Sequence, residues 1–205
     1  MARIETPLLD TIQIAFLHQL IIDIPQLALF MRQATRLQAP NEARVDFYYY
    51  GIQVEFLPLT RAFGEKSGLR ISCNELDKQL PSLAQVFTSV FPSTYMAEHL
   101  YICGHRCLPS QWQGDIENLL WLEILSPFTA ARNVYVFKAF SQCISSALQD
   151  LVGERMTDVL PALESLFLEG FQPSGPVQEA IGQFVAARQL LGHPVAISPL
   201  NETGQ

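Results

Sequence analysis

Four residues with metal-binding and nucleophilic side chains fall within nine consecutive positions: His99, Cys103, His105 and Cys107. Imidazole nitrogens and thiolates are ligands that zinc prefers, so this cluster could in principle hold zinc. The spacing His-x3-Cys-x-His-x-Cys matches no common zinc finger. A Cys–His pair could also form a nucleophilic site, but no carboxylate that would orient the histidine is evident. A surface histidine and loop cysteines are the simpler interpretation, and we expect no metal, no other cofactor and no catalytic residue.

Signatures of the common catalytic sites are missing elsewhere in the sequence as well. There is no GxSxG nucleophile elbow, Walker A loop, GxGxxG or HExxH motif. The sequence therefore favours a protein that is not an enzyme. The alternative is a small α/β hydrolase or transferase with a degenerate site. A closed pocket that gathers His99, Cys103 and His105 with a carboxylate would favour this alternative.

The elements around this cluster repeat along the chain. AEHLYI at 97–102, ARNVYV at 131–136 and LESLFL at 163–168 share one pattern, and their last residues are 34 and 32 positions apart. LDTIQI at 9–14 fits the same LxxLxL template, and 69–71 and 195–197 are shortened copies. A strand followed by a helix, repeated at such intervals, is typical of a leucine-rich-repeat solenoid. Solenoids of this kind usually recognise partners.

Amphipathic segments at helical spacing separate the copies, for example 81–91, 116–125, 142–152 and 177–191. Alternating apolar residues on either side of Gly51 predict a β-hairpin near 44–57. We therefore predict an α/β fold: an open leucine-rich-repeat-like solenoid with a mainly parallel sheet in sequence order, helices on one face, and the added hairpin. An ordinary doubly wound α/β domain also alternates strands and helices and stays open as an alternative.

Composition narrows the class of protein. Of the 205 residues, 49% are hydrophobic and 16% charged, which indicates a folded domain. The net charge of -7 argues against nucleic acid and anionic membranes as partners. No apolar run is long enough to span a bilayer, and the first residues do not resemble a secretory signal. The four cysteines show no disulfide spacing, so we expect an intracellular protein, cytoplasmic or nuclear. We expect one domain over 1–199 and a disordered tail over 200–205.

The residues marked x in LxxLxL would point away from the helices, onto the open face of the sheet. On neighbouring strands these positions would form one column of Gln13, Arg70, Tyr101, Tyr135 and Phe167. Aromatic and arginine side chains dominate protein-binding hot spots. Loop cover over the aromatic residues, or simple packing of a curved sheet, remains the alternative. The candidate partner-binding residues are Arg70, His99, Tyr101, Arg132, Tyr135 and Phe167.

Several longer strings resemble a known family. These are DIEN and WLEILSPFTA within 115–130, ALQDLVGER at 147–155, VLPAL at 159–163, and GPVQEAI and FVAARQL within 175–190. In this order they resemble the C-terminal, leucine-rich-repeat-like region of basidiomycete fungal F-box-type proteins, over roughly residues 3–198.

The resemblance implies a recognition role, because such proteins are thought to be substrate adaptors of Skp–cullin–F-box ubiquitin ligases. The Leu-Pro-rich F-box itself is absent, and Met1 stands directly before a repeat strand. We therefore expect the recognition half alone or a truncated product, with an unknown protein substrate as partner. A Skp adaptor is expected only for a longer form that carries an F-box.

Overall fold

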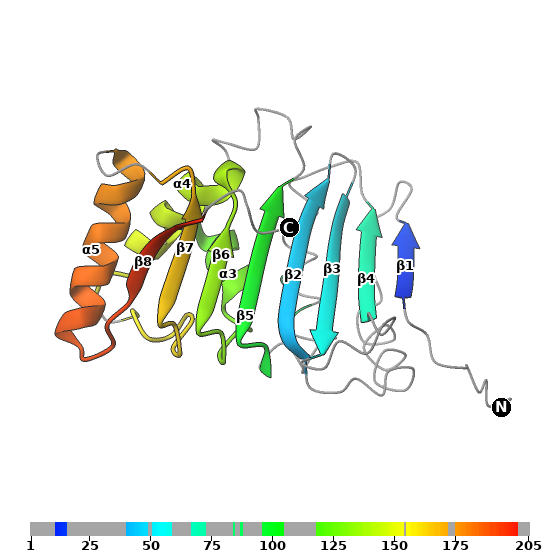
Figure 1. The fold of residues 1–205 in the computed structure, drawn as a ribbon, viewed down its shortest axis with the longest axis horizontal. Helices are drawn as coiled ribbons and strands as arrows, with labels where there is room; N and C mark the ends of the chain where they lie inside the picture. Colours follow the sequence, from blue (N-terminus) through cyan, green and yellow to red (C-terminus); the bar gives the residue numbers. More distant parts are fainter. Residues whose placement is uncertain are drawn as a thin grey trace, which may run out of the picture.

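The computed structural model of the chain contains one eight-stranded sheet (Figure 1). The strands are β1 (Thr11–Ala15), β2 (Pro40–Tyr48), β3 (Gly51–Pro58), β4 (Ser67–Ser72), β5 (His99–Gly104), β6 (Asn133–Val136), β7 (Ser165–Glu169) and β8 (Ala196–Leu200). The described helices are α3 (Asn118–Leu125), α4 (Lys138–Gln149) and α5 (Pro176–Leu190). The structure describes residues 11–15, 40–48, 51–58, 67–72, 84, 87, 96–104, 118–153, 155–171 and 175–200.

The C-terminal half follows the predicted strand–helix alternation. Strands β5, β6, β7 and β8 are neighbours in sequence order, and each adjacent pair is parallel. The helices α3, α4 and α5 lie in the three connections between them. A parallel pair requires such a crossover, because the chain must return to the starting edge before it can run in the same direction again.

The same backbone hydrogen bonds recur where the strands of this half begin. The amides of Arg132 and Asn133 donate to the carbonyl of Glu98, at 2.9 and 3.0 Å. One strand later, the amides at 164 and 165 donate to the carbonyl of Arg132, at 2.8 and 2.9 Å, and Ala196 donates to the carbonyl of Glu164 at 2.8 Å. The sequence repeat therefore corresponds to a repeat of backbone geometry.

The N-terminal half departs from sequence order. The sheet runs β1-β4-β3-β2-β5, so the antiparallel meander β2–β3–β4 lies between β1 and β5. The predicted hairpin is present as β2 and β3, but it lies inside the sheet, and the expectation of a sheet strictly in sequence order is wrong here. A tight connection between two alternating strands forces antiparallel pairing, and β4 then continues the meander.

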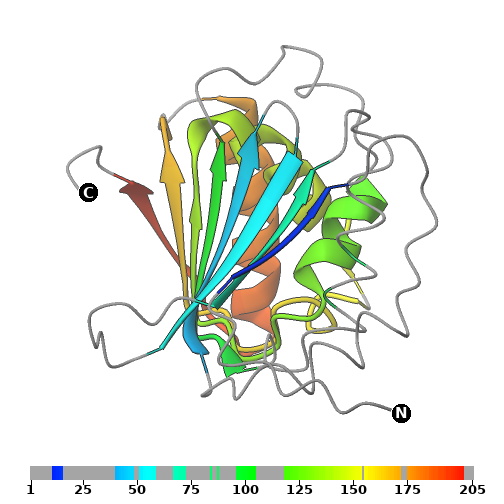
Figure 2. The same ribbon diagram turned by 90° about the vertical axis from the view of Figure 1, so that its right-hand side faces the viewer.

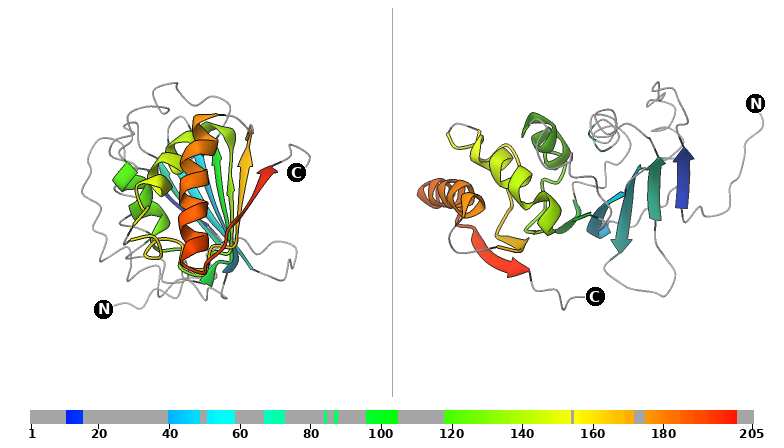
Figure 3. Two further views of the ribbon diagram at one scale, coloured as in Figure 1. Left: turned by 90° about the vertical axis from the view of Figure 1, so that its left-hand side faces the viewer. Right: turned by 90° about the horizontal axis from the view of Figure 1, so that it is seen from above.

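All described helices cover one face of the sheet (Figures 2 and 3). The strand residues that face them are buried, in rows such as Leu100, Val134 and Leu166 at 0% exposure. The leucine positions of the LxxLxL repeat therefore face the helices, opposite to the x positions. The two halves share one core, since Phe47 of β2 lies 4.6 Å from Phe140 of α4 between ring centroids. None of the described helices is long and apolar enough to cross a membrane.

Helix boundaries and phases differ in places from the predicted ones. Within the segment predicted as a helix over 116–125, Leu119 is 59% exposed, because α3 turns Trp121 and Leu122 inward instead. Helix α4 begins at Lys138, not near 142, so Ser141 lies inside it and donates a 3.3 Å hydrogen bond to the carbonyl of Glu169. Leu200 belongs to β8, although the predicted tail included it. The remaining predicted tail, 201–205, lies outside the described residues.

Among the residues that the structure describes, the most deeply buried charge is Arg188 of α5, at 0% exposure. Its guanidinium nitrogens donate to the carbonyls of Met156, Leu160, Pro161, Leu163 and His193 at 3.1–3.4 Å. Burial lowers the pKa of this guanidinium. Backbone carbonyls thus solvate the cation and tie α5 to the connection that precedes β7.

Candidate functional site

The sheet face opposite the described helices, called the open face below, carries three stacked aromatic rings. Tyr101 and Tyr135 stack with centroids 4.4 Å apart and planes 7° apart. Tyr135 and Phe167 stack at 4.6 Å and 8°. All three side chains are partly exposed. This aromatic ladder of Tyr101, Tyr135 and Phe167 is the most distinctive arrangement on the open face.

Backbone register explains the ladder. Tyr101 pairs with Tyr135 across β5 and β6, and Tyr135 pairs with Phe167 across β6 and β7. Adjacent strands lie about 4.8 Å apart, close to the observed spacing of the rings. Because the strands are parallel and in register, the same position of each repeat puts a ring beside the preceding ring. The predicted aromatic column is therefore present for these three residues.

His99 begins β5, two residues before Tyr101, and lies beside the ladder. Its ring is 6.2 Å from the Tyr135 ring, with planes 23° apart, and its Nδ1 lies 3.4 Å from the Tyr135 hydroxyl. In register it pairs with Asn133, which pairs in turn with Ser165. This row runs beside the ladder, two residues earlier on each strand. His99 thus contacts the ladder, and it can hold the Tyr135 hydroxyl in one orientation.

Arg132 lies at the entry to β6 and is exposed. Its guanidinium forms a 2.5 Å ion pair with Glu164, and both side chains are more than half exposed. An exposed pair of this kind contributes at most about 1 kcal/mol to stability. Arg132 and Glu164 therefore form an exposed ion pair directly before β6 and β7, the strands that carry Tyr135 and Phe167.

Arg70 does not belong to the ladder row, contrary to the prediction. Its backbone pairs with Gln13 on β1 and Gln53 on β3. Strands β3 and β2 stand between it and Tyr101, whose own register partner on β2 is Arg44. The inserted hairpin separates Arg70 from the rings, and its side chain lies outside the part of the chain that is described.

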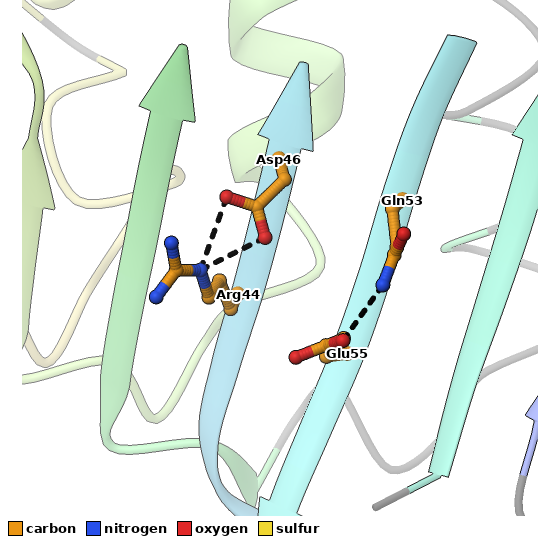
Figure 4. Close-up of polar contacts among 4 residues, drawn as sticks. All are labelled: Arg44, Asp46, Gln53 and Glu55. Atoms are coloured by element: carbon orange, nitrogen blue, oxygen red, sulfur yellow. Dashed lines mark hydrogen bonds and ion pairs between the residues drawn. The ribbon is translucent and has the colours of Figure 1, made fainter. Parts of the chain in front are cut away.

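The residue that takes the place predicted for Arg70 is Arg44. Its Nε donates to both carboxylate oxygens of Asp46, at 3.0 and 2.8 Å (Figure 4). This hydrogen bond raises the pKa of the Arg44 guanidinium. The terminal nitrogens of Arg44 point away from Asp46 toward β5, which carries Tyr101 (Figure 4). The sequence could have indicated that Arg44 lies on the open face. It alternates with the apolar residues Ala43 and Val45, which face the core.

A second polar pair lies on β3. The Gln53 amide donates to the Glu55 carboxylate at 2.7 Å, along the same strand (Figure 4). In register, Gln53 opposes Asp46 and Glu55 opposes Arg44. We call Arg44, Asp46, Gln53 and Glu55 the polar half of the open face. It continues the same surface as the ladder with different chemistry.

The His/Cys cluster is not assembled as a reactive site in the described part of the chain. His99 and Cys103 are four residues apart on β5, so their Cα atoms are about 13 Å apart. Two ligands of one zinc ion must bring their donor atoms within about 4 Å of each other. His105 and Cys107 lie outside the described residues. Among those described, no group of three or more His, Cys, Asp or Glu could hold a metal ion.

Cys103 is itself unsuited to nucleophilic chemistry. It is 5% exposed, and burial raises the pKa of its thiol to about 12. The carboxylate of Asp46 raises this pKa further, while Arg44 lowers it. The thiolate is the reactive and metal-binding form, and it is scarce near neutral pH when the pKa is so high. Cys103 therefore fills space between the ladder and the polar half.

Comparison of the chain with protein-family models, with curated proteins and with solved structures gives no significant match in any of the three.

Proposed function

We propose that this protein is a noncatalytic interaction module that holds a partner protein on its open face. The observation that carries the proposal is the aromatic ladder, three partly exposed rings on a face that none of the described helices covers. Aromatic residues that combine large contact area with polar tips dominate protein-binding surfaces. The Tyr135 hydroxyl and the exposed Arg132, which precedes β6, would supply the polar part of such a surface.

The stacking geometry favours a protein partner over a sugar or a nucleobase. Flat ligands bind to the faces of aromatic rings, but each inner face of the ladder already lies against another ring. The middle of the ladder presents ring edges and hydroxyl groups to a partner. Ring edges can pack against apolar side chains of a partner protein, and hydroxyl groups can form hydrogen bonds with its backbone. The net charge of -7 also disfavours polyanions.

The repeat supports a solenoid-like role for residues 96–200. Parallel strands, helices on one side and recurring hydrogen bonds at the strand entries are features of such arrays. We extend the proposal to a leucine-rich-repeat-like recognition region, and the resemblance to fungal F-box-type proteins makes a ubiquitin-ligase adaptor the assembly to test. Co-purification of Skp and cullin subunits with a longer form that carries an F-box would support it.

The experiment for the binding face is affinity capture with matched variants. The variant Tyr101→Ala with Tyr135→Ala removes two rungs and leaves every buried core residue in place. The control is Gln53→Ala with Glu55→Ala, which truncates two side chains on the polar half of the same face. We expect proteins captured by the wild type to persist with the control and to be lost with the ladder variant.

A thermal melt of each variant separates binding from folding. Loss of capture with a cooperative melt retained supports the binding face. Loss of capture together with a collapsed melt would show that the rings are packing residues. Capture that survives removal of both tyrosines would overturn the proposal, because the partner would then use another surface.

A further inference from the structure

Strand β8 forms one end of the sheet, so one of its two edges has no neighbour among the described strands (Figure 1). Successive residues of a strand turn their backbone N–H and C=O groups to opposite edges. The amide of Ala196 donates to the carbonyl of Glu164, directly before β7, at 2.8 Å. The backbone groups of Ser198 therefore face β7 as well, and those of Ile197 and Pro199 face the outer edge.

Pro199 has no N–H, and in β8 it stands where this loss affects the outer edge alone. Placed one residue earlier or later, a proline would remove a donor from the pairing with β7. Between Ala196 and Leu200 the outer edge therefore carries a single N–H donor, that of Ile197. The pyrrolidine ring also occupies the space into which an N–H would point.

The repeat shows what stands at this position when a further strand follows. In register, Pro199 corresponds to residues of the three preceding strands, Leu168, Val136 and Ile102. All three are buried, whereas Pro199 is exposed. The carbonyl of Ile102 accepts the Phe137 amide at 3.0 Å, so at this position the backbone groups face the next strand. In β8, proline replaces the residue whose backbone would hold another strand.

We propose that Pro199 closes the outer edge of β8 to strand addition, so that neither a second copy of this chain nor an extended partner segment lengthens the sheet there. Exposed edges otherwise offer rows of unpaired backbone groups to a further strand. An added strand opposite Pro199 would meet the ring and leave one of its own carbonyls without a donor. The inference goes beyond the proposed function, because it concerns an edge of the sheet and not its open face.

The test restores the missing donor. Pro199→Val gives the outer edge an N–H. Ser198→Val is the matched control, because it adds the same side chain on the same strand at a residue whose backbone faces β7. In an antiparallel pair of β8 strands from two copies, Pro199→Val regains two hydrogen bonds, one from each copy.

Sedimentation over a concentration series measures the effect of both variants. We expect self-association of Pro199→Val to be roughly tenfold tighter than that of the wild type, or more, from the regained hydrogen bonds. Ser198→Val should associate no more tightly than the wild type. Association of Pro199→Val that is no tighter than the wild type, or an equal increase in Ser198→Val, would overturn the inference. Thermal melts verify that both variants are folded.

Amide hydrogen exchange locates the association and also tests the wild type, which needs no substitution. In Pro199→Val, exchange at Ile197 should slow as protein concentration rises, because this amide then donates to the second copy. In the wild type, a closed edge predicts the same exchange rate at Ile197 at low and high protein concentration, and after addition of an extended peptide of alternating threonine and valine. Slower exchange at Ile197 of the wild type under either condition would overturn the inference. The capture test of Tyr101 and Tyr135 is unaffected, since neither lies on β8.

Discussion

The open face is built in two ways on the two sides of β5. From β5 to β7 its side chains interact across strands, as rings stacked 4.4 and 4.6 Å apart. On β2 and β3 its side chains interact along a strand, as the pairs Arg44–Asp46 and Gln53–Glu55. The buried face beneath shows no such division, since both halves contribute to one apolar cluster.

The difference follows from topology. Parallel repeats in register place the same repeat position side by side, so a tyrosine or phenylalanine kept at that position becomes a stack. A hairpin contains no repeat, and its neighbours are set by antiparallel register, which opposes Arg44 to Glu55. Cross-strand pairs of this kind contribute roughly 0.2–1 kcal/mol each. The ladder is therefore a product of the repeat, and the polar half is a product of the insertion that interrupts it.

Cys103 marks the border between the two halves, and the largest effect we predict concerns its thiol. A pKa raised from 9.0 to about 12 lowers the thiolate fraction at pH 8 by about three tenfold steps. We expect alkylation of Cys103 to be slowed by at least that factor relative to the unfolded chain, as measured by mass spectrometry of the peptide that contains it. Rapid alkylation of Cys103 in the folded protein would contradict this prediction, because it would mean that the thiol is accessible to solvent.

The raised thiol pKa also fixes the direction of a pH effect. The folded state favours the neutral thiol, so its contribution to stability is complete below about pH 9 and is lost as pH rises toward about 12. The Cys103→Ala variant should show a shallower fall of the unfolding free energy over that window. If the unfolding free energies of the variant and the wild type fall equally steeply with pH, the thiol of Cys103 does not have a raised pKa in the folded state.

The next effect tests whether the two halves share one core. Leu166 lies beneath the ladder at 0% exposure, and Ile52 lies beneath the polar half at 1%. We expect either substitution by alanine to lower the unfolding free energy by roughly 2–5 kcal/mol, the usual cost of a large-to-small change in a core. Denaturant titration measures both. A loss under about 1 kcal/mol for Ile52→Ala alone would make the halves separate folding units.

A smaller effect separates the ladder's stacking from its hydroxyl groups. Tyr135 is the middle rung, and its replacement by alanine removes two stacked contacts at about 0.5–1.5 kcal/mol each. Tyr135→Phe keeps both stacks and removes only the weak 3.4 Å contact with His99. We therefore expect a loss of about 1–3 kcal/mol for the alanine variant and under about 0.5 kcal/mol for the phenylalanine variant. If both variants lose the same unfolding free energy, the hydroxyl group of Tyr135 stabilises the fold and the stacked ring does not.

The C-terminal half was largely predictable, because periodicity alone determines which residues face the core. The pattern at 131–136 and 163–168 predicted buried Val134 and Leu166 and an aromatic column between them, and both are confirmed. The mainly parallel sheet followed from the same repeat. Local sequence carried this information because each strand meets its neighbour through an equivalent crossover.

The N-terminal half and the deepest polar contacts could not be predicted in the same way. Nothing local states that the hairpin enters the sheet between β4 and β5, so Arg70 was placed beside rings that it does not reach. Arg188 lies on a helix, where an arginine is usually exposed, but four of the five carbonyls that bind it come from 25–32 residues earlier. Such partners depend on how distant segments pack, which spacing along the chain does not encode.

The smallest predicted effect concerns the charge pair of the polar half. Arg44 is close to half exposed and Asp46 is mostly buried, so removing the cation leaves a carboxylate short of one partner. We expect Arg44→Met to lower the unfolding free energy by up to about 1 kcal/mol at low salt, and by less at high salt, because screening weakens an exposed pair. Tyr135→Ala supplies the control, since ring stacking should be nearly independent of salt. Denaturant titrations at two salt concentrations compare them directly. A salt-independent loss for Arg44→Met would show that its stem packs on Tyr101, its register partner, and that the ladder in effect begins at β2.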